Sequence, residues 1–394
     1  MLLRVLTRVS ALLASMILSS ALAGGPAATA TPDGGYDLIV GTYTGGRSEG
    51  LYVYRFDARD GKASPLGIAK TVNPSYVVVS RDRRFVYAVN ELPGGAGGGG
   101  GVSAFGFDAA SGSLTFLNQV ASEGGDPCYL QLSPDGRYLL VANYAASGSA
   151  QGSFSVLPLA ADGRPGAAVQ TVRHQGSGPV RGRQDGAHVH STVFSPDGRL
   201  LLVQDLGTDG IYAYRYTPGG SPGPVEPVEW HRTTVEAGTG PRHLIFSGDG
   251  HHAYLTSELA GTVSAFSYQD GELALQQVEP LAAPGFTGKV GAAALHLSPD
   301  GRFLYVSNRG DANDISIFAV DGRSGRLTRV GRQSSLGRTP REFAIDPTGR
   351  WLVVGNQDSD TAYIFRRDLR TGLLGPDPQR LEIGSPVDFK FLAR

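Results

Sequence analysis

Cysteine is nearly absent from this sequence, whose 394 residues include only Cys128. A lone cysteine cannot form a disulfide within the chain, so a small extracellular scaffold held together by disulfides is excluded. An excess of charge of one sign is also missing, because 35 Lys and Arg are balanced by 36 Asp and Glu. Without a positive excess, we expect no nucleic acid partner and no attraction to anionic lipid.

The sequence also lacks a hydrophobic run long enough to span a bilayer, which takes roughly 20 helical residues. The apolar run Ala11–Ala23 follows two arginines and ends in small residues that are typical of a signal-peptidase site, and a second such site ends at Ala30. We therefore interpret residues 1–30 as a signal peptide cleaved after Ala23 or Ala30, with an uncleaved anchor as the alternative. The mature protein is then expected to be exported, periplasmic or secreted, without stable membrane insertion.

A recurring hairpin pattern organises the rest of the sequence. In its clearest copy, AALHLSPDGRFLYVSNR, two runs of alternating apolar residues flank a Ser-Pro-Asp-Gly turn, which predicts two antiparallel strands. This copy spans Ala293–Arg309, and five further copies end at Glu91, Tyr144, Leu206, Glu258 and Gln357. The segments Asp37–Tyr43 and Ser385–Phe391, near the two ends of the chain, supply the two halves of a seventh copy.

Every hairpin is followed by another short strand and then by a weaker fourth one. Four antiparallel strands repeated at a period of about 50 residues are typical of propeller blades. We therefore predict an all-β fold, a seven-bladed β-propeller of four-stranded antiparallel blades over residues 36–394. Pairing of the N- and C-terminal strands closes the ring and removes a free sheet edge, which is compatible with a monomer.

Two glycine-containing motifs suggest other chemistry but lie in the wrong context. The run Gly94–Gly101 has neither a Lys-Ser/Thr pair nor a helix behind it, so it is predicted to be a hairpin connection rather than a phosphate-binding loop. Ser48 lies in a G-x-S-x-G match, but a strand follows where a nucleophile elbow requires a helix. We interpret Ser48 as a loop residue.

Positions at which the copies differ indicate the functional site. We align the copies on the Ser of the Ser-Pro-Asp-Gly turn or its counterpart. The position five residues before it holds Ser75, Cys128, His190, Arg242, Ala293, Arg341 and, in the terminal copy, Val387. The position eleven residues after it holds Glu91, Tyr144, Leu206, Glu258, Arg309, Gln357 and, in the first strand, Tyr43. Because the free ends of two antiparallel strands meet, both columns are expected to ring one mouth of the central channel.

These columns bring together arginines, carboxylates and an imidazole, which predicts a functional pocket rather than a solvated ring of ion pairs. Arginines can orient a carboxylate or phosphate and can stabilise a developing oxyanion. Neighbouring arginines should keep Glu258 ionised and His190 neutral, so either one could act as general base on a water molecule. A metal held by His188, His190 and a carboxylate is the alternative, which the nearby arginines disfavour electrostatically.

The sequence resembles the seven-bladed propeller lactonases, the family of the propeller-type 6-phosphogluconolactonase and the fungal carboxy-cis,cis-muconate cyclase. The resemblance runs from about Tyr36 to Leu392. It is carried by His190-Ser191, Gly240-Pro241-Arg242-His243, Ser257-Glu258-Leu259, Ser307-Asn308-Arg309 and the block from Thr339 to Gly349. It implies a metal-independent site, made of His190, Arg242, Glu258 and Arg309, that opens or closes a lactone ring.

The favoured hypothesis is a lactonase that hydrolyses a sugar-type or carboxylated lactone without a cofactor. In it, His190, Arg242, Glu258 and Arg309 are catalytic, and the substrate pocket is shaped by Glu91, Tyr144, Arg341 and Gln357. The alternatives are a muconate-type lactonising cycloisomerase and a non-catalytic propeller that binds an acidic ligand or an envelope partner. The predicted export does not fit the cytoplasmic role of a phosphogluconolactonase, which favours a lactone met outside the cytoplasm.

Overall fold

The computed structural model describes residues 35–94, 99–145, 152–221 and 223–394. Regular structure in these residues consists of 28 strands and one short 3-10 turn, Gln357–Ser359, so the predicted all-β class is confirmed. Within the same ranges, no helix has the length and apolar character needed to cross a bilayer. The predicted signal peptide, residues 1–30, lies outside the described residues.

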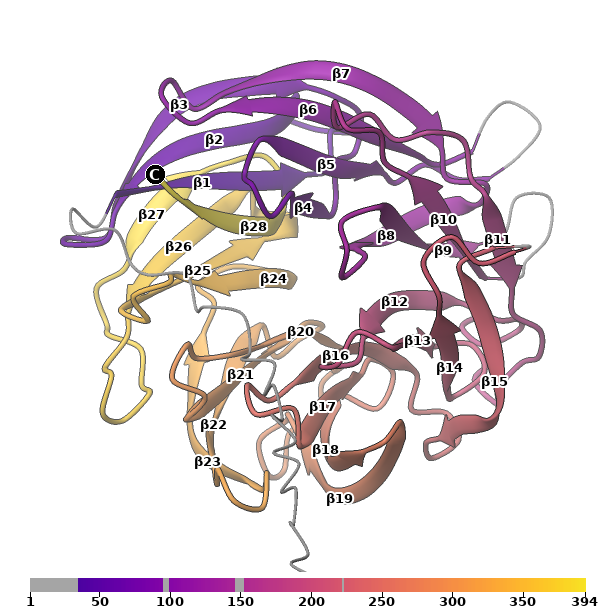
Figure 1. Cartoon of the computed structure of the whole chain (residues 1–394). Coiled ribbons are helices and arrows are strands. Elements are labelled where there is room, and N and C mark those ends of the chain that lie inside the picture. Colours follow the sequence, from indigo (N-terminus) through magenta and orange to yellow (C-terminus); the bar gives the residue numbers. More distant parts are fainter. Residues whose placement is uncertain (1–34, 95–98, 146–151, 222) are drawn as a thin grey trace, which may run out of the picture.

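The strands form seven four-stranded antiparallel sheets around a central axis (Figure 1), as the repeat predicted. From the innermost strand outward, the blades are β28 (Pro386–Ala393), β1 (Gly35–Thr42), β2 (Gly50–Asp57) and β3 (Lys62–Lys70); β4 (Val77–Val79), β5 (Phe85–Asn90), β6 (Gly101–Asp108) and β7 (Ser113–Ala121); β8 (Gly125–Leu132), β9 (Tyr138–Ala145), β10 (Ser153–Pro158) and β11 (Gln170–Arg173); β12 (Val189–Phe194), β13 (Leu200–Asp205), β14 (Gly210–Tyr216) and β15 (Val225–Thr234); β16 (Pro241–Phe246), β17 (His252–Ser257), β18 (Thr262–Gln269) and β19 (Glu272–Pro280); β20 (Ala292–Leu297), β21 (Phe303–Asn308), β22 (Asp314–Val320) and β23 (Leu327–Ser334); β24 (Pro340–Ile345), β25 (Trp351–Asn356), β26 (Thr361–Arg366) and β27 (Gln379–Glu382).

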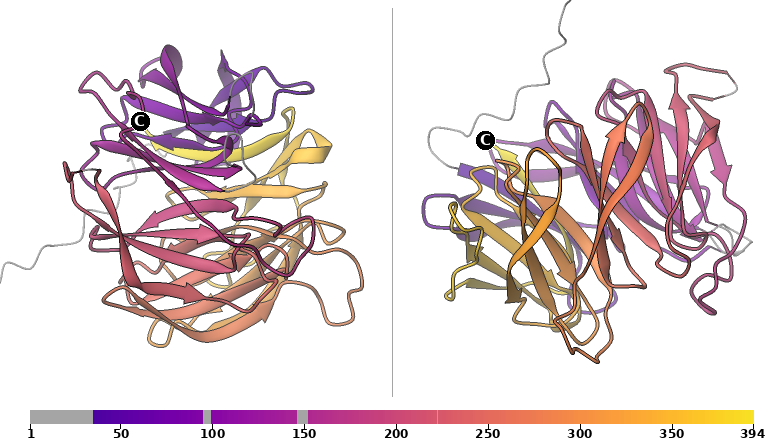
Figure 2. Two further views of the ribbon diagram at one scale, coloured as in Figure 1. Left: turned by 90° about the vertical axis from the view of Figure 1, so that its right-hand side faces the viewer. Right: turned by 90° about the horizontal axis from the view of Figure 1, so that it is seen from below.

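The first and last strands close the ring. β28 pairs antiparallel with β1, from Tyr36 opposite Ala393 to Thr42 opposite Pro386. The yellow C-terminal strand accordingly lies against the indigo N-terminal strands in the side view as well (Figure 2). The predicted closure is therefore confirmed, and it joins the blade in which the chain starts to the strand with which it ends.

The core lies between neighbouring blades rather than at the centre of the ring. One apolar cluster, for example, combines Val40 and Phe56 of the first blade with Val353 and Ile364 of the blade before it in the ring. Burying a side chain of this size stabilises the fold by about 1.5–3 kcal/mol. The second strand of each blade, such as β21, is covered on both faces, and its residues are mostly apolar. In outer strands such as β7, exposed and partly buried side chains are interspersed.

A β-bulge near the start of the innermost strand aims specific side chains. In β12, Val189 pairs with Asp205 and Ser191 pairs with Gln204, which leaves His190 without a cross-strand partner. Arg341 is the extra residue of β24 in the same way. The register shifts at the equivalent place in β8, β16, β20 and β28. A bulge redirects the side chain of the extra residue. In these six strands, the bulge includes the residue that the repeat alignment places five positions before the turn.

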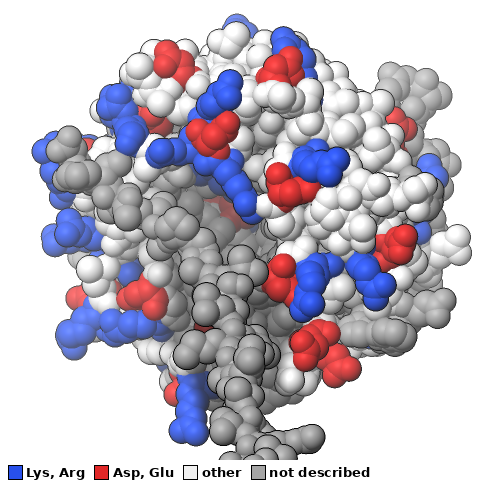
Figure 3. Space-filling model, in the orientation of Figure 1, with Lys and Arg blue, Asp and Glu red and all other residues white. Residues whose placement is uncertain are grey.

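Charges of both signs are interspersed on the face of the ring shown in Figure 3. Many of the acidic side chains touch a basic one within the same turn, as Asp57 does with Arg59 and Asp197 with Arg199. Exposed pairs of this kind contribute little to stability, because water and salt screen them. Among the described residues visible in Figure 3, acidic side chains lie close to basic ones.

Candidate functional site

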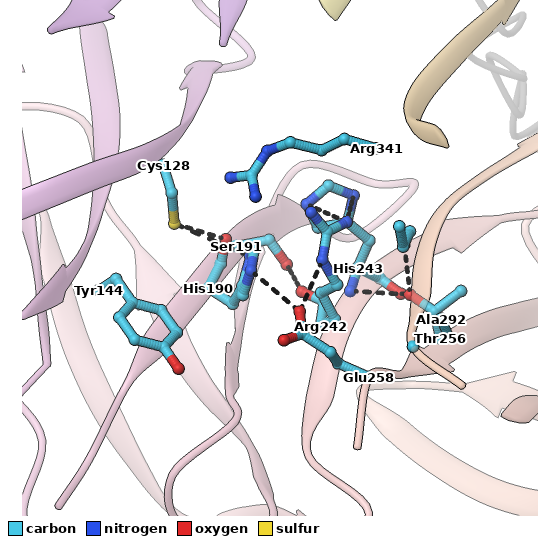
Figure 4. A network of polar contacts seen from close by, with 12 residues as sticks. Cys128, Tyr144, His190, Ser191, Arg242, His243, Thr256, Glu258, Ala292 and Arg341 are labelled. Atoms are coloured by element: carbon cyan, nitrogen blue, oxygen red, sulfur yellow. Dashed lines mark hydrogen bonds and ion pairs between the residues drawn. The ribbon is translucent and has the colours of Figure 1, made fainter. Parts of the chain in front are cut away.

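Glu258, directly after β17, is the centre of a polar cluster where the inner strands begin (Figure 4). Its Oε2 lies 2.7 Å from Arg309 Nη2 and accepts a hydrogen bond from Arg242 Nε at 3.1 Å. Its Oε1 accepts a hydrogen bond from Arg183 Nη2 at 2.5 Å. His190 Nε2 lies 3.7 Å from Oε2. The other three residues predicted to be catalytic, His190, Arg242 and Arg309, therefore surround the Glu258 carboxylate, together with Arg183, which was not predicted.

Hydrogen bonds between blades fix the bulges that carry this cluster. Ser191 Oγ donates to the Arg242 carbonyl at 2.6 Å, and Cys128 Sγ lies 3.5 Å from the His190 carbonyl. In the next pair of blades, Thr256 Oγ1 donates to the Ala293 carbonyl at 3.0 Å. A side chain of one blade thus satisfies the bulge carbonyl of the next, which holds the extra residues in place.

Burial strengthens the electrostatic interactions among these side chains, because little water screens them. Arg242, His190 and Glu258 are 1%, 4% and 7% exposed, and the side chain of Arg309 is 16% exposed. Buried charges are tolerated when they are paired and hydrogen-bonded. Here three guanidiniums, including that of Arg183, surround one carboxylate, so the cluster keeps a positive excess. It is suited to receive an anion or a developing negative charge.

The electrostatics assign a protonation state to each group. Burial alone would raise the pKa of Glu258, but Arg309, His190 and Arg242, with the hydrogen bond from Arg183, hold it well below its usual range. Burial and the charge of Arg242 lower the pKa of His190 well below 6.5, although Glu258 acts in the opposite direction. At neutral pH the cluster therefore contains an ionised carboxylate and a neutral imidazole.

A second group of predicted residues lies beside the first. Arg341 Nη2 lies 3.6 Å from Glu91 Oε2, and the Arg341 guanidinium lies over the Tyr43 ring, 5.6 Å from its centroid. Ser75 Oγ donates a hydrogen bond to Glu91 Oε2. The charges of Glu91 and Arg341 offset each other, so this group adds polar contacts without adding to the positive excess.

Tyr144 and Cys128 both lie next to His190. The Tyr144 ring is edge-on to His190 at a centroid distance of 5.7 Å and is stacked on His188 at 4.3 Å. Cys128 Sγ lies 3.8 Å from His190 Nδ1. Burial raises the pKa of the Cys128 thiol, so it does not supply a thiolate nucleophile at neutral pH.

His188 supports Tyr144 instead of facing His190. Its Nδ1 lies 2.9 Å from the Tyr144 carbonyl, to which it donates a hydrogen bond. In the part of the chain that the structure describes, no group of three or more His, Cys, Asp or Glu side chains is arranged to hold a metal ion. Gln357 begins the 3-10 turn, and its backbone N–H donates to the Thr339 carbonyl at 3.1 Å. Among the described residues, its side chain forms no hydrogen bond with the Glu258 cluster.

A pocket of about 410 Å³ opens beside Glu258. It is lined by Val180, Arg183, Gly238, Glu258, Leu259, Val290, Gly291, Arg309, Gly310 and Thr339. A volume of this size admits a small molecule. A larger groove, of about 1060 Å³, lies between the β2–β3 turn and the β26–β27 connection. Its titratable lining is Arg and Asp, neither of which titrates near neutral pH, so it is less suited to acid–base chemistry.

Arg183 and His243 are the members of the cluster that the repeat alignment missed. Arg183 belongs to the connection 174–188 between β11 and β12, which is longer than the corresponding connection of every other blade. His243 follows the bulge residue Arg242, whose Nη1 lies 3.2 Å from its Nδ1. It was visible only as part of the Gly-Pro-Arg-His motif.

Comparison with known proteins gives a consistent result. The family model described as "Lactonase, 7-bladed beta-propeller" matches residues 37–391. The chain is 35% identical to the 6-phosphogluconolactonase of Bacillus subtilis (strain 168) over 360 residues. This aligned region covers 91% of this chain and 98% of that protein. Among solved structures, the Pseudomonas aeruginosa periplasmic gluconolactonase PpgL matches with a TM-score of 0.87 and 48% identity, over 91% of this chain and 99% of that one. A putative 6-phosphogluconolactonase from Bacteroides fragilis NCTC 9343 matches with a TM-score of 0.85 and 40% identity, over 92% and 99% of the two chains.

Proposed function

The chain belongs to the seven-bladed β-propeller lactonase family, and we propose that it hydrolyses a sugar-type or carboxylated lactone at the Glu258 cluster, at the mouth of the central channel. The observation that carries this proposal is the buried, neutral His190 beside a carboxylate and a set of guanidiniums. An imidazole in its basic form, next to cations that can hold an oxyanion, is what hydrolysis of a cyclic ester requires.

His190 acts as the general base in this proposal. Its imidazole takes a proton from a water molecule, and the water oxygen attacks the lactone carbonyl to give a tetrahedral intermediate. The ring C–O bond then breaks, and the imidazolium returns its proton to the leaving ring oxygen. The product is the open hydroxy acid, so one water is consumed and His190 is regenerated.

Arg242 and Arg309 hold the carbonyl oxygen as it becomes an oxyanion. Both guanidiniums are anchored on Glu258 Oε2, which limits the reorganisation needed when negative charge develops. Burial, with the charges of Arg309 and Arg341, lowers the pKa of Arg242 to about 10, so it remains a cation at neutral pH.

Glu258 orients these groups instead of taking the proton from water. A carboxylate bonded to guanidiniums is too weak a base for that step, since its pKa lies well below the usual value. Its place 3.7 Å from His190 Nε2 suits it to stabilise the imidazolium that forms during the reaction. Because both Glu258 oxygens are already bonded to arginines, we assign the role of general base to His190 and a positioning role to Glu258, a choice that the sequence left open.

Glu91, Arg341, Tyr144 and Gln357 are proposed to bound the substrate. Glu91 and Arg341 form an ion pair, and the Tyr144 ring packs edge-on against His190. We further propose that residues 1–30 are a signal peptide and that the enzyme works outside the cytoplasm. The similar Pseudomonas protein, whose name places it in the periplasm, supports this compartment.

The test is turnover of a lactone panel: 6-phosphogluconolactone, gluconolactone and a carboxymuconolactone. Because such lactones also open spontaneously, the comparison is with His190→Ala and with buffer. The matched control is His251→Ala, since His251 is exposed in the turn before β17. Hydrolysis by the wild type and by His251→Ala, lost in His190→Ala, supports the proposal. Equal rates for His190→Ala and wild type would overturn it, and a product of unchanged mass would indicate isomerisation instead.

A further inference from the structure

We propose that Arg183 forms an anion subsite that binds a phosphate or carboxylate group carried by the lactone away from its reacting ester. The inference rests on the proposed function and adds a residue that determines which lactone is preferred. It stands on the anchoring of Arg183, on its unused donors and on the charge balance around Glu258.

The main chain that carries Arg183 is fixed in place. The next residue, Gln184, is fully buried, and its Nε2 donates to the Leu206 carbonyl at 2.8 Å and to Asp209 Oδ1 at 2.9 Å. Gln184 Oε1 in turn accepts a hydrogen bond from the Val180 N–H at 3.1 Å. Arg183 therefore projects from an anchored backbone, and its guanidinium is preorganised for binding.

Among the three guanidiniums at Glu258, that of Arg183 is the most open to a ligand. The side chains of Arg242, Arg309 and Arg183 are 2%, 16% and 45% exposed. Both hydrogen bonds of the Arg183 side chain involve Nη2, which donates to Glu258 Oε1 at 2.5 Å and to the Tyr144 hydroxyl at 3.5 Å. Its Nε and Nη1 have no hydrogen-bond partner among the described residues. These donors can form the paired contacts by which arginine recognises phosphate and carboxylate.

The positive charges around Glu258 exceed the negative charges, even when the oxyanion of the intermediate is included. Three guanidiniums around one carboxylate give an excess of two positive charges at Glu258. The oxyanion of the tetrahedral intermediate offsets one of them, near Arg242 and Arg309. An anionic group on another part of the substrate would offset the second, and Arg183 is the most exposed of the three guanidiniums.

The position of Arg183 also separates this subsite from the reacting ester. Arg183 contacts Oε1 of Glu258, whereas Arg242, Arg309 and His190 gather at Oε2. Both Arg183 and Arg309 line the same pocket of about 410 Å³. A ligand in this pocket can thus place its ester near Arg309 and its anionic group near Arg183.

The test compares substrates that differ by one phosphate. For Arg183→Gln, kcat/KM is measured with 6-phosphogluconolactone and with gluconolactone. We expect the loss for the phosphorylated lactone to exceed the loss for gluconolactone by about 10- to 100-fold, mainly in KM, and Arg183→Lys to recover part of it. A loss that only reflects a disturbed Glu258 is common to both substrates and cancels in this ratio. Equal losses would overturn the inference.

Two further arms complete the design. Carboxymuconolactone replaces the phosphorylated substrate to show whether the subsite prefers carboxylate, and Arg181→Gln, an exposed arginine of the same connection, is the matched control. If the wild type hydrolyses none of these lactones, the proposed function fails, and the subsite is judged by titration calorimetry. A loss of affinity in Arg183→Gln for 6-phosphogluconate of about tenfold or more relative to gluconate then supports it. Equal changes for the two acids would refute it.

Discussion

Replacing Glu258 with glutamine should damage both the stability and the activity of this protein. Glu258 is 7% exposed and contacts Arg309, Arg242 and Arg183. Removing one partner of a buried ion pair costs about 3–5 kcal/mol, because the other charge stays buried without compensation. The pair with Arg183 adds little to this, since that side chain is 45% exposed and screened by water. We therefore expect the free energy of unfolding to fall by about 3–5 kcal/mol, mainly through Arg242 and Arg309.

Activity should fall further than stability alone explains. Glutamine cannot stabilise an imidazolium on His190 or keep both arginines in place, so kcat should drop by at least about 100-fold in protein that is still folded. Urea unfolding followed by tryptophan fluorescence gives the stability, and lactone hydrolysis gives the rate. Glu272→Gln, at the exposed start of β19, is the matched control.

The pH dependence of the stability difference provides an internal check. The pKa of Glu258 in the folded protein is well below its usual value of 4.5, so its contribution is fully present above pH 4.5 and is lost as the pH falls through the folded value. The difference between wild type and Glu258→Gln should be constant from pH 5 to 8 and shrink only in acid. A variant within about 1 kcal/mol of wild type that keeps half of its turnover would refute the reasoning.

Three other outcomes follow from the structure. Arg309→Ala should lower kcat for every lactone by about 100-fold or more, because one oxyanion donor is lost, and a change confined to KM would show a binding role instead. Cys128→Ala should keep most of the activity, and thiol reagents should inactivate the wild type only slowly, since burial raises the pKa of the thiol; rapid inactivation that Cys128→Ala prevents would contradict this. Truncation after Gly384 removes β28 and exposes the edge of β1, so the shortened protein should aggregate or fail to melt cooperatively in calorimetry, whereas a wild-type melt would show that closure is dispensable.

The fold was predictable because each blade repeats a local pattern. Alternating residues around Ser-Pro-Asp-Gly determine both the strands and the turn, as in the hairpin of β20 and β21, and six such copies leave few arrangements other than a ring. The incomplete segments near the two ends predicted closure for the same reason. What the repeat could not show is the bulge, since His190 and its neighbours carry no distinct sequence signal for an extra residue in β12.

The candidate site was predictable only where it uses equivalent positions of the repeat. His190, Arg242, Glu258 and Arg309 belong to the two aligned columns, and the structure brings them together. Arg183 lies outside the columns and 75 residues before Glu258, so its contact depends on how the 174–188 connection packs. The disfavoured metal alternative, in which His188 and His190 face the same way, assumed regular alternation along the strand, which the bulge in β12 breaks.

The central claim is that a neutral His190 in this cluster hydrolyses the lactone. Its most direct test is the pH dependence of kcat/KM for the wild type, with the spontaneous rate subtracted at each pH. Because burial and Arg242 keep the pKa of His190 well below 6.5, the account predicts a profile that stays flat from pH 8 to below pH 6.5 and declines only in more acidic solution. A profile that already falls at pH 6.5 or above, or the absence of turnover above that of His190→Ala, would contradict it.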